Sequence, residues 1–97
     1  MATRNTFTEL NRDTVVDSGV DTDASGDTTV TFDGLREIDS PTDVEVQALG
    51  GYVANVQSVS GNKATVRIYQ GGGADTELAA ITGTNGVTDL HAEAVGK

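Results

Sequence analysis

The 97 residues suffice for one domain with a small core, because a chain of this length buries only about 60–70% of the surface that its unfolded form exposes. Fifteen acidic residues against six basic ones give a formal net charge of −9, which repels phosphates and argues against direct nucleic-acid binding. The absence of cysteine excludes disulfides, thiolate metal sites and cysteine nucleophiles.

The charged residues are biased toward two types, Asp and Arg. Acidic residues are mostly Asp, basic residues are mostly Arg, and Thr is abundant. This balance resembles that of proteins from salt-loving archaea and their viruses, whose anionic, lysine-poor surfaces stay hydrated in concentrated salt. An ordinary acidic extracellular β-domain is the alternative. No apolar stretch approaches the ~20 residues of a membrane helix, and the start lacks the apolar region of a signal peptide, so we expect a soluble protein.

Residues 1–27 are polar and rich in Thr and Asp, with isolated apolar residues and one possible short strand at residues 14–16. Composition alone would favour a disordered terminus. We expect instead an extended N-terminal arm that a neighbouring subunit holds. Phe7 and Leu10 are its candidate anchors on that partner, and the short strand around Val15 is a candidate for backbone pairing with the partner's exposed edge.

A β-domain is predicted for residues 28–97. It begins with residues 28–32, whose β-branched and aromatic composition is typical of a strand, and the turn signal Asp33-Gly34 follows. A second turn is expected at Pro41, because proline cannot donate a hydrogen bond to a sheet.

Residues 43–70 contain three alternating strand patterns separated by two turn signals, which predict a three-stranded antiparallel meander. Gly50 and Gly51 tolerate the positive φ of a tight hairpin, so the second strand is expected beside the first. The turn at residues 60–62 leads into the third strand. The expected core residues of this meander are Val44, Val46, Val66 and Ile68.

The end of the chain adds two shorter strands. Residues 71–73 form a glycine joint. Residues 77–81 fit either a helical turn or a short strand, and the context favours the strand. Residues 87–95 form a last strand. Its alternation places two sets of side chains on opposite faces: Leu90, Ala92 and Ala94 inward, and Asp89, His91 and Glu93 outward. With about six to eight short strands and no helical period, the sequence predicts an all-β fold, a single antiparallel β-sandwich of immunoglobulin-like or jelly-roll-like type.

An acidic loop before the β-domain matches the opening of a calcium-binding loop. Asp21, Asp23 and Ser25 supply oxygen atoms at the first, third and fifth positions, and Gly26 is the turn-making sixth. The twelfth position requires a bidentate Glu and holds Phe32. We therefore expect a solvated loop and no cofactor, with Asp21, Asp23 and Ser25 as the candidate ligands if Ca²⁺ or another cation binds.

His91 is the only histidine, and it lies between Asp89 and Glu93 on one strand face. A carboxylate–imidazole cluster of this kind can bind a metal or act as a general base. However, strand neighbours at i and i+2 lie nearly 7 Å apart, roughly two rises of a strand, too far to share one ion without a ligand from another strand. We expect an exposed, charge-paired histidine and no catalytic residues.

Residues 29–69, TVTFDGLREIDSPTDVEVQALGGYVANVQSVSGNKATVRIY, resemble a pattern common in small β-sandwich proteins of tailed-virus particles. The shared features are a strand that ends in an aromatic residue, a VxV strand after a proline, a VSGN hairpin and a TVRIY strand. The ending VTDLHAEAVGK is similar to their last strand. H-type lectins and tail-tip sandwiches show a similar pattern, but Leu35 stands where an aromatic residue is usual, which argues against sugar binding.

Together with the acidic composition, the resemblance implies a non-enzymatic virion structural protein of a halophilic archaeal tailed virus. Such proteins decorate capsids, or build turrets, necks and tails, as homo-oligomers. The implied partners are further copies of the chain and other virion proteins such as the major capsid protein. A receptor- or glycan-binding module, which needs exposed aromatic residues, and a small metal-dependent enzyme, which needs a convergent polar site, are the alternatives.

Overall fold

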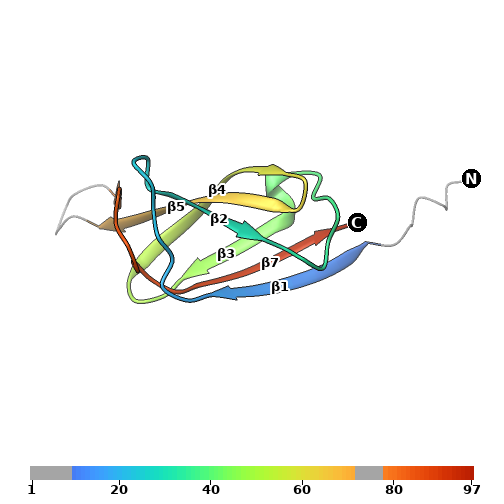
Figure 1. Cartoon of the computed structure of the whole chain (residues 1–97), viewed down its shortest axis with the longest axis horizontal. Helices are drawn as coiled ribbons and strands as arrows, with labels where there is room; N and C mark the ends of the chain where they lie inside the picture. Colours follow the sequence, from blue (N-terminus) through green and yellow to red (C-terminus); the bar gives the residue numbers. More distant parts are fainter. Residues whose placement is uncertain (1–9, 72–77) are drawn as a thin grey trace, which may run out of the picture.

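The computed structural model describes residues 10–71 and 78–97, and seven strands form in this part of the chain (Figure 1). They are β1 Asn11–Asp17, β2 Asp27–Thr31, β3 Val44–Ala48, β4 Tyr52–Ser60, β5 Lys63–Gly71, β6 Leu78–Ala80 and β7 Leu90–Gly96. One antiparallel sheet has the order β1-β7-β3, and the other has the order β2-β5-β4, with β6 also paired to β5. Their packing face to face confirms the predicted all-β antiparallel sandwich.

The core lies between the sheets and is built by side chains that alternate along the two central strands. These buried residues are Ala64, Val66 and Ile68 on β5, and Leu90, Ala92 and Ala94 on β7. They confirm the inward faces predicted for both strands. Phe32, just after β2, is the largest fully buried side chain. Most of the core is Val and Ala, so each side chain removes little area from water, at roughly 25 cal/mol per Å².

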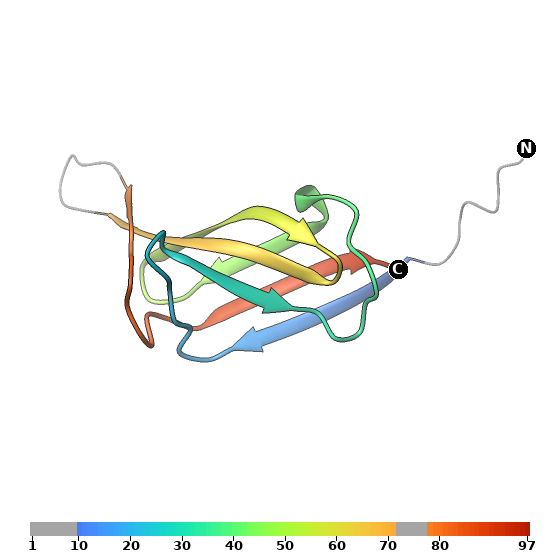
Figure 2. The ribbon, with the colours of Figure 1, turned by 45° about the horizontal axis from the view of Figure 1, so that its top comes forward.

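The predicted meander of residues 43–70 is confirmed only in its second half. β4 and β5 form the expected antiparallel hairpin. The expected pairing of the first two strands is wrong, because β3 pairs with β7, with Val44 opposite Ala94. Gly50 (φ 77°) and Gly51 (φ 87°) therefore lead the chain from one sheet to the other (Figure 2). Alternation identifies the buried face of a strand, and both β3 and β4 bury that face in the same core, but it does not identify the bonded neighbour.

The core residues predicted for that stretch are placed as expected. Val44, Val66 and Ile68 are buried, and Val46 is half-buried against the core. The predicted turn at Pro41 becomes a short 3-10 helix, η2 (Pro41–Asp43), in which the Ser40 hydroxyl accepts a hydrogen bond from the backbone N–H of Thr42.

Much of the segment predicted to be an N-terminal arm belongs to the sandwich instead. β1 pairs with β7 of its own chain along its whole length, and it contains the predicted short strand at residues 14–16. The chain then crosses the end of the sandwich, where Val20 is buried. Polar composition misled the prediction because an edge strand needs few apolar side chains, and β1 turns only Val15 onto the core. Residues 1–9 lie outside the described part of the chain.

The last two strands are shorter than predicted. β6 confirms the strand expected within residues 77–81, whereas most of the glycine joint, from residue 72, is outside the described residues. β7 starts at Leu90 rather than at Val87. Val87 instead donates its backbone N–H to the carbonyl of Val20 at 2.8 Å, and Val20 donates to the carbonyl of Thr88 at 2.9 Å. This exchange ties the loop before β7 to the segment that follows β1.

Gly96 gives a direct test of the packing at the end of β7. A Cβ atom added there would collide with the backbone carbonyl oxygen of Glu37, whereas one added at Gly71 would meet, among the described residues, only the Leu78 Cδ2 atom at 3.9 Å. Lys97 also donates its N–H to that carbonyl of Glu37 at 2.9 Å, so the loop cannot withdraw freely. We expect Gly96→Ala to lower the free energy of unfolding by about 1–3 kcal/mol, as overpacking does.

The control for that experiment is Gly71→Ala, which makes the same change in a strand where the added methyl group would make an ordinary contact with Leu78. Urea denaturation of both variants in concentrated salt measures the difference. Equal stability of the two variants would show that the Glu37 loop does not lie against β7 as described.

Candidate functional site

The sandwich has two open sides, at which an edge strand of one sheet lies over an edge strand of the other. β1 faces β2 on one side, and β3 faces β4 on the other. In the part of the chain that the structure describes, no further strand pairs with β1, β3 or β4 to close these sides (Figure 2). The chemistry of these two sides differs.

The β1/β2 side is polar and acidic. A groove of about 490 Å³ runs along it, lined by Asp13, Thr14, Val15, Asp17, Thr29, Thr31, Asp33 and Gly34. The Asp13 carboxylate accepts a hydrogen bond from the backbone N–H of Gly34 at 2.9 Å, which joins β1 to the turn after β2. On this side, the hydrogen bond between Gly34 and Asp13 therefore links the two sheets, and the aspartates give the groove a negative potential.

The β3/β4 side is apolar. Six residues of these two strands pack against the core and yet remain only partly buried: Val46, Ala48, Tyr52, Ala54, Val56 and Val59. By contrast, the inward residues of the central strand β5 are fully buried. The core thus reaches solvent along β3 and β4 because none of the described strands covers their outer edges.

The β4 edge also lacks charge. Among the edge strands longer than three residues, β1 carries Arg12, Asp13 and Asp17, β2 carries Asp27, and β3 carries Glu45. The nine residues of β4, YVANVQSVS, contain no charged residue, no proline and no glycine. Natural sheets protect exposed edges with charged residues or proline. An unprotected edge offers its backbone N–H and C=O groups to another strand.

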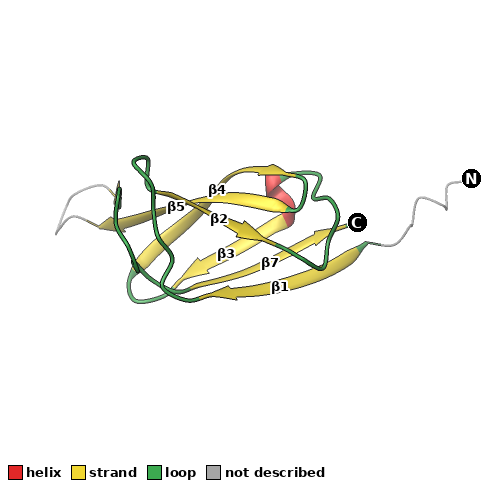
Figure 3. Cartoon of the chain, viewed as in Figure 1, coloured by secondary structure: helices red, strands yellow, loops and turns green. Residues whose placement is uncertain are grey.

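The two ends of β4 differ in how accessible they are. The pairing with β5 is irregular between Val56 and Ser58, where a bulge interrupts it, and η2 packs near the end of the strand (Figure 3). Residues 52–56 are regular, and the Val53 side chain on the outer face is 40% exposed. We call residues 52–56 the β4 edge.

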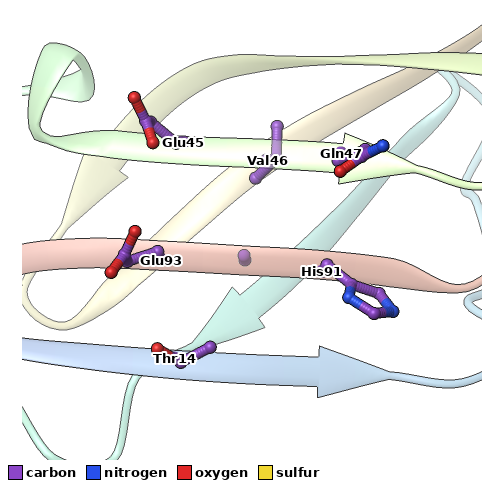
Figure 4. Close-up of a pocket in the computed structure, with 7 residues that line it drawn as sticks. Thr14, Glu45, Val46, Gln47, His91 and Glu93 are labelled. Atoms are coloured by element: carbon purple, nitrogen blue, oxygen red, sulfur yellow. The ribbon is translucent and has the colours of Figure 1, made fainter.

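His91 lies on the outer face of the β1-β7-β3 sheet in a shallow depression of about 570 Å³ (Figure 4). Glu93 lies directly opposite Glu45 of β3 there, and its carboxylate is 3.3 Å from the guanidinium of Arg12. Asp89 turns elsewhere, since its carboxylate accepts the backbone N–H of Gly19 at 2.8 Å. The Asp89–His91–Glu93 cluster suggested by the spacing is therefore divided among different partners.

The acidic loop uses its carboxylates to hold backbone groups. One Asp23 oxygen accepts the N–H groups of Ser25 at 2.8 Å and Asp27 at 3.0 Å, and Asp21 accepts the N–H of Gly86 at 2.9 Å. The hydrogen bonds from Asp27 and Ser25 lower the pKa of the Asp23 carboxyl from its ordinary value of 3.8. The candidate ligands Asp21, Asp23 and Ser25 thus shape the loop, and the first two point to different partners.

Asp27 and Arg67 form the closest ion pair on the outer face of the β2-β5-β4 sheet. The Arg67 Nε lies 2.7 Å from one Asp27 oxygen and the Nη2 lies 3.3 Å from the other, a two-pronged contact that raises the pKa of Arg67 above its ordinary value. The pair fixes β2 to β5, which it joins across the ladder.

The three candidate partner residues lie in different settings. Phe7 is outside the described residues, so its role as an anchor stays a prediction. Leu10 is 65% exposed just before β1 and is free to meet a partner. Val15 packs against the core of its own chain, which leaves only the β1 backbone for the pairing that was expected of it.

Residues 10–71 and 78–97 bring no group of three His, Cys, Asp or Glu side chains together as metal ligands. In the same residues no helix is long and apolar enough to span a membrane. Comparisons of the chain with family models, with curated proteins and with solved structures found no match.

Sequence reasoning missed the β4 edge because it placed residues 52–59 between two other strands. A signal was present, since no charged residue occurs from residue 46 to residue 62, a longer uncharged run than residues 78–88, in a chain with 22% charged residues. That signal identifies an edge only after the strand order is known.

The acidic loop generates a prediction on pH dependence. Because the folded pKa of Asp23 lies below its unfolded value, the carboxylate stabilises the fold above pH 3.8, and this contribution is lost as the pH falls through the folded pKa. Asp23→Ala should therefore lower the melting temperature at about pH 7, and the gap to the wild type should narrow toward about pH 3. Asp33→Ala, at an exposed position, is the matched control. A gap that is constant over this pH range would contradict the role of Asp23.

Proposed function

We propose that this chain is a non-catalytic structural protein of a virion that works by associating with copies of itself and with other particle proteins. The β4 edge carries the proposal: an uncharged edge beside a partly exposed apolar side, on a chain whose net charge is −9. A surface of this kind stays soluble through its charge and keeps one place where a strand can be added.

The place of the protein in a particle follows from its composition and from the resemblance described above. We propose a capsid decoration or turret protein of a halophilic archaeal tailed virus, with a neck or tail position as the alternative. Most acidic side chains lie on the outer faces and in the loops, where they are hydrated, whereas the interior is small and apolar. The pattern suits a domain that works in concentrated salt.

A glycan- or receptor-binding module finds less support. It would need aromatic side chains presented together on one face. Tyr52 packs against the core, and Phe32 is fully buried, which leaves Tyr69 as the aromatic side chain on an outer sheet face in the described part of the chain.

The acidic surface predicts stability that rises with salt. Screening shortens the reach of charge repulsion to about 3 Å at 1 M salt, from about 10 Å at 0.1 M. The melting temperature should therefore increase between about 0.1 M and about 3 M KCl. A flat profile would remove the support for a halophilic origin.

Glu45 supplies a sharper form of that test, because it lies directly opposite Glu93 and like charges at such positions repel. Glu45→Gln should raise the melting temperature in dilute salt and have little effect in about 3 M KCl, where the repulsion is screened. Thr14→Glu, which adds a carboxylate on β1 directly opposite Glu93, should have the opposite sign in dilute salt. Salt-independent effects of both changes would contradict the electrostatic account.

Sedimentation of intact particles tests the proposed function. Particles purified from the cells that make this chain should contain it in a fixed ratio to the major capsid protein, as measured by quantitative mass spectrometry. Recovery of the chain only in the particle-free fraction would contradict a structural role in the virion.

A further inference from the structure

We propose that the β4 edge is the contact between two copies of this chain, with residues 52–56 of one copy pairing antiparallel with the same residues of the other around Ala54. The inference rests on the proposed function, to which it adds the partner, the strand and the register. It uses the open β3/β4 side described above.

Backbone groups provide the first argument. β4 is bonded to β5 on one side only in the described part of the chain, so along its other side the N–H and C=O groups that point outward have no strand to pair with. A second β4 strand would satisfy them and make one continuous sheet through both copies. The inward side chains would at the same time lose part of their exposure, because the neighbouring copy would cover the edge at which the core reaches solvent.

The side chains fit a two-fold arrangement. In an antiparallel pair centred on Ala54, Tyr52 lies opposite Val56 of the partner subunit, and Val53 lies opposite Asn55 of the partner subunit. Residues directly opposite share a face in such a pair, so the inward residues of both copies stay on the core side. The smallest of them, Ala54, falls on the axis, where it lies opposite Ala54 of the partner subunit. The bulge after Val56 limits the pairing to these five residues.

The fit of residues 52–56 to their own copy identifies the occupant, and charge then favours β4 as the strand on which two copies pair. Two copies each carry −9, so they approach best where neither has charge on the strand that pairs. Self-pairing of β1 would bring Asp13 and Asp17 of both copies together at the acidic groove. β3 carries Glu45, which already faces Glu93. β4 carries no charge and so avoids this repulsion, and concentrated salt weakens what remains between the rest of the two chains.

A contact this short implies a dimer with low affinity in solution. Many copies of the contact in one particle would together bind more tightly. Five paired residues cover far less than the roughly 800 Å² per partner of a standard interface. Many such contacts on one assembly act together, since each bound copy raises the effective concentration of the next. The solution experiments therefore use about 1 mM protein in about 3 M KCl, which favour association by mass action and by screening.

Cysteine cross-linking tests the register. The chain has no cysteine, so Ala54→Cys introduces a single thiol. Opposite residues of an antiparallel pair have Cα atoms about 4.5–5.5 Å apart, within the range of a disulfide. Mild oxidation should convert most of the Ala54→Cys protein into a covalent dimer. The more exposed Val16→Cys on β1 is the control and should remain largely monomeric.

Charge variants test the strand independently. Val53→Glu with Asn55→Glu places carboxylates opposite each other twice across the axis, so the dissociation constant measured by sedimentation equilibrium should rise by about tenfold or more. Val16→Glu with Gln47→Glu makes the same charge change on the other sheet and should leave association near that of the wild type. Mixing the first variant with Val53→Lys plus Asn55→Lys should restore dimers that contain one copy of each.

The outcomes separate this inference from the proposed function. If the wild type associates but both glutamate variants behave alike and Ala54→Cys does not cross-link, the contact lies elsewhere and the inference is overturned, while a structural role stands. If the wild type remains monomeric at about 1 mM, the inference is overturned by itself, and sedimentation with particles decides the proposed function. Three results together support the inference: association that is lost only in the Val53→Glu, Asn55→Glu variant, its restoration by the Val53→Lys, Asn55→Lys variant, and a covalent dimer of Ala54→Cys.

Discussion

The pairing of β5 with its neighbours is the constraint on which the structure depends. β5 bonds to β2, β4 and β6, and its inward residues Ala64, Val66 and Ile68 are fully buried against the opposite sheet. With β5 central, β2 and β6 share one of its flanks and β4 takes the other, so β4 is left at an edge. The sandwich is too small to cover that edge, and the apolar residues beside it stay partly exposed. The candidate contact is thus a consequence of the small sheets and the small core, which consists mostly of Val and Ala and leaves β4 uncovered by other described strands.

The acidic residues serve the loops as well as the surface. Four aspartates hold backbone N–H groups across turns or between elements: Asp13, Asp21, Asp23 and Asp89. A short carboxylate suits the turn at Asp23, because it accepts hydrogen bonds close to its own backbone, whereas the other three aspartates each tie together segments distant in the sequence. Part of the preference for Asp over Glu in the sequence therefore has a structural reason. It also explains why acidic spacing suggested a calcium loop where the carboxylates bind the chain itself.

Local patterns predicted the strands well and their neighbours poorly. Alternation and turn residues were enough for β4, β5 and β7 and for the inward sets on β5 and β7, because a half-buried strand imposes a period of two on its own sequence. The pairing of β3 with β7 joins residues far apart in the chain, and no local signal specifies it. β1 was misread as an arm because Val15 is its only inward apolar residue. The β4 edge became visible only after these pairings placed β4 at the rim of its sheet.

Hydrogen exchange measures most directly whether the β4 edge is an interface between copies. The backbone amides of residues 52–56 that do not bond to β5 should exchange more slowly as the protein concentration rises from about 0.01 mM to about 1 mM in concentrated KCl. Those at the free edge of β1 should show no such change. Exchange at β4 that is independent of concentration, or equal slowing at β1 and β4, would contradict the account.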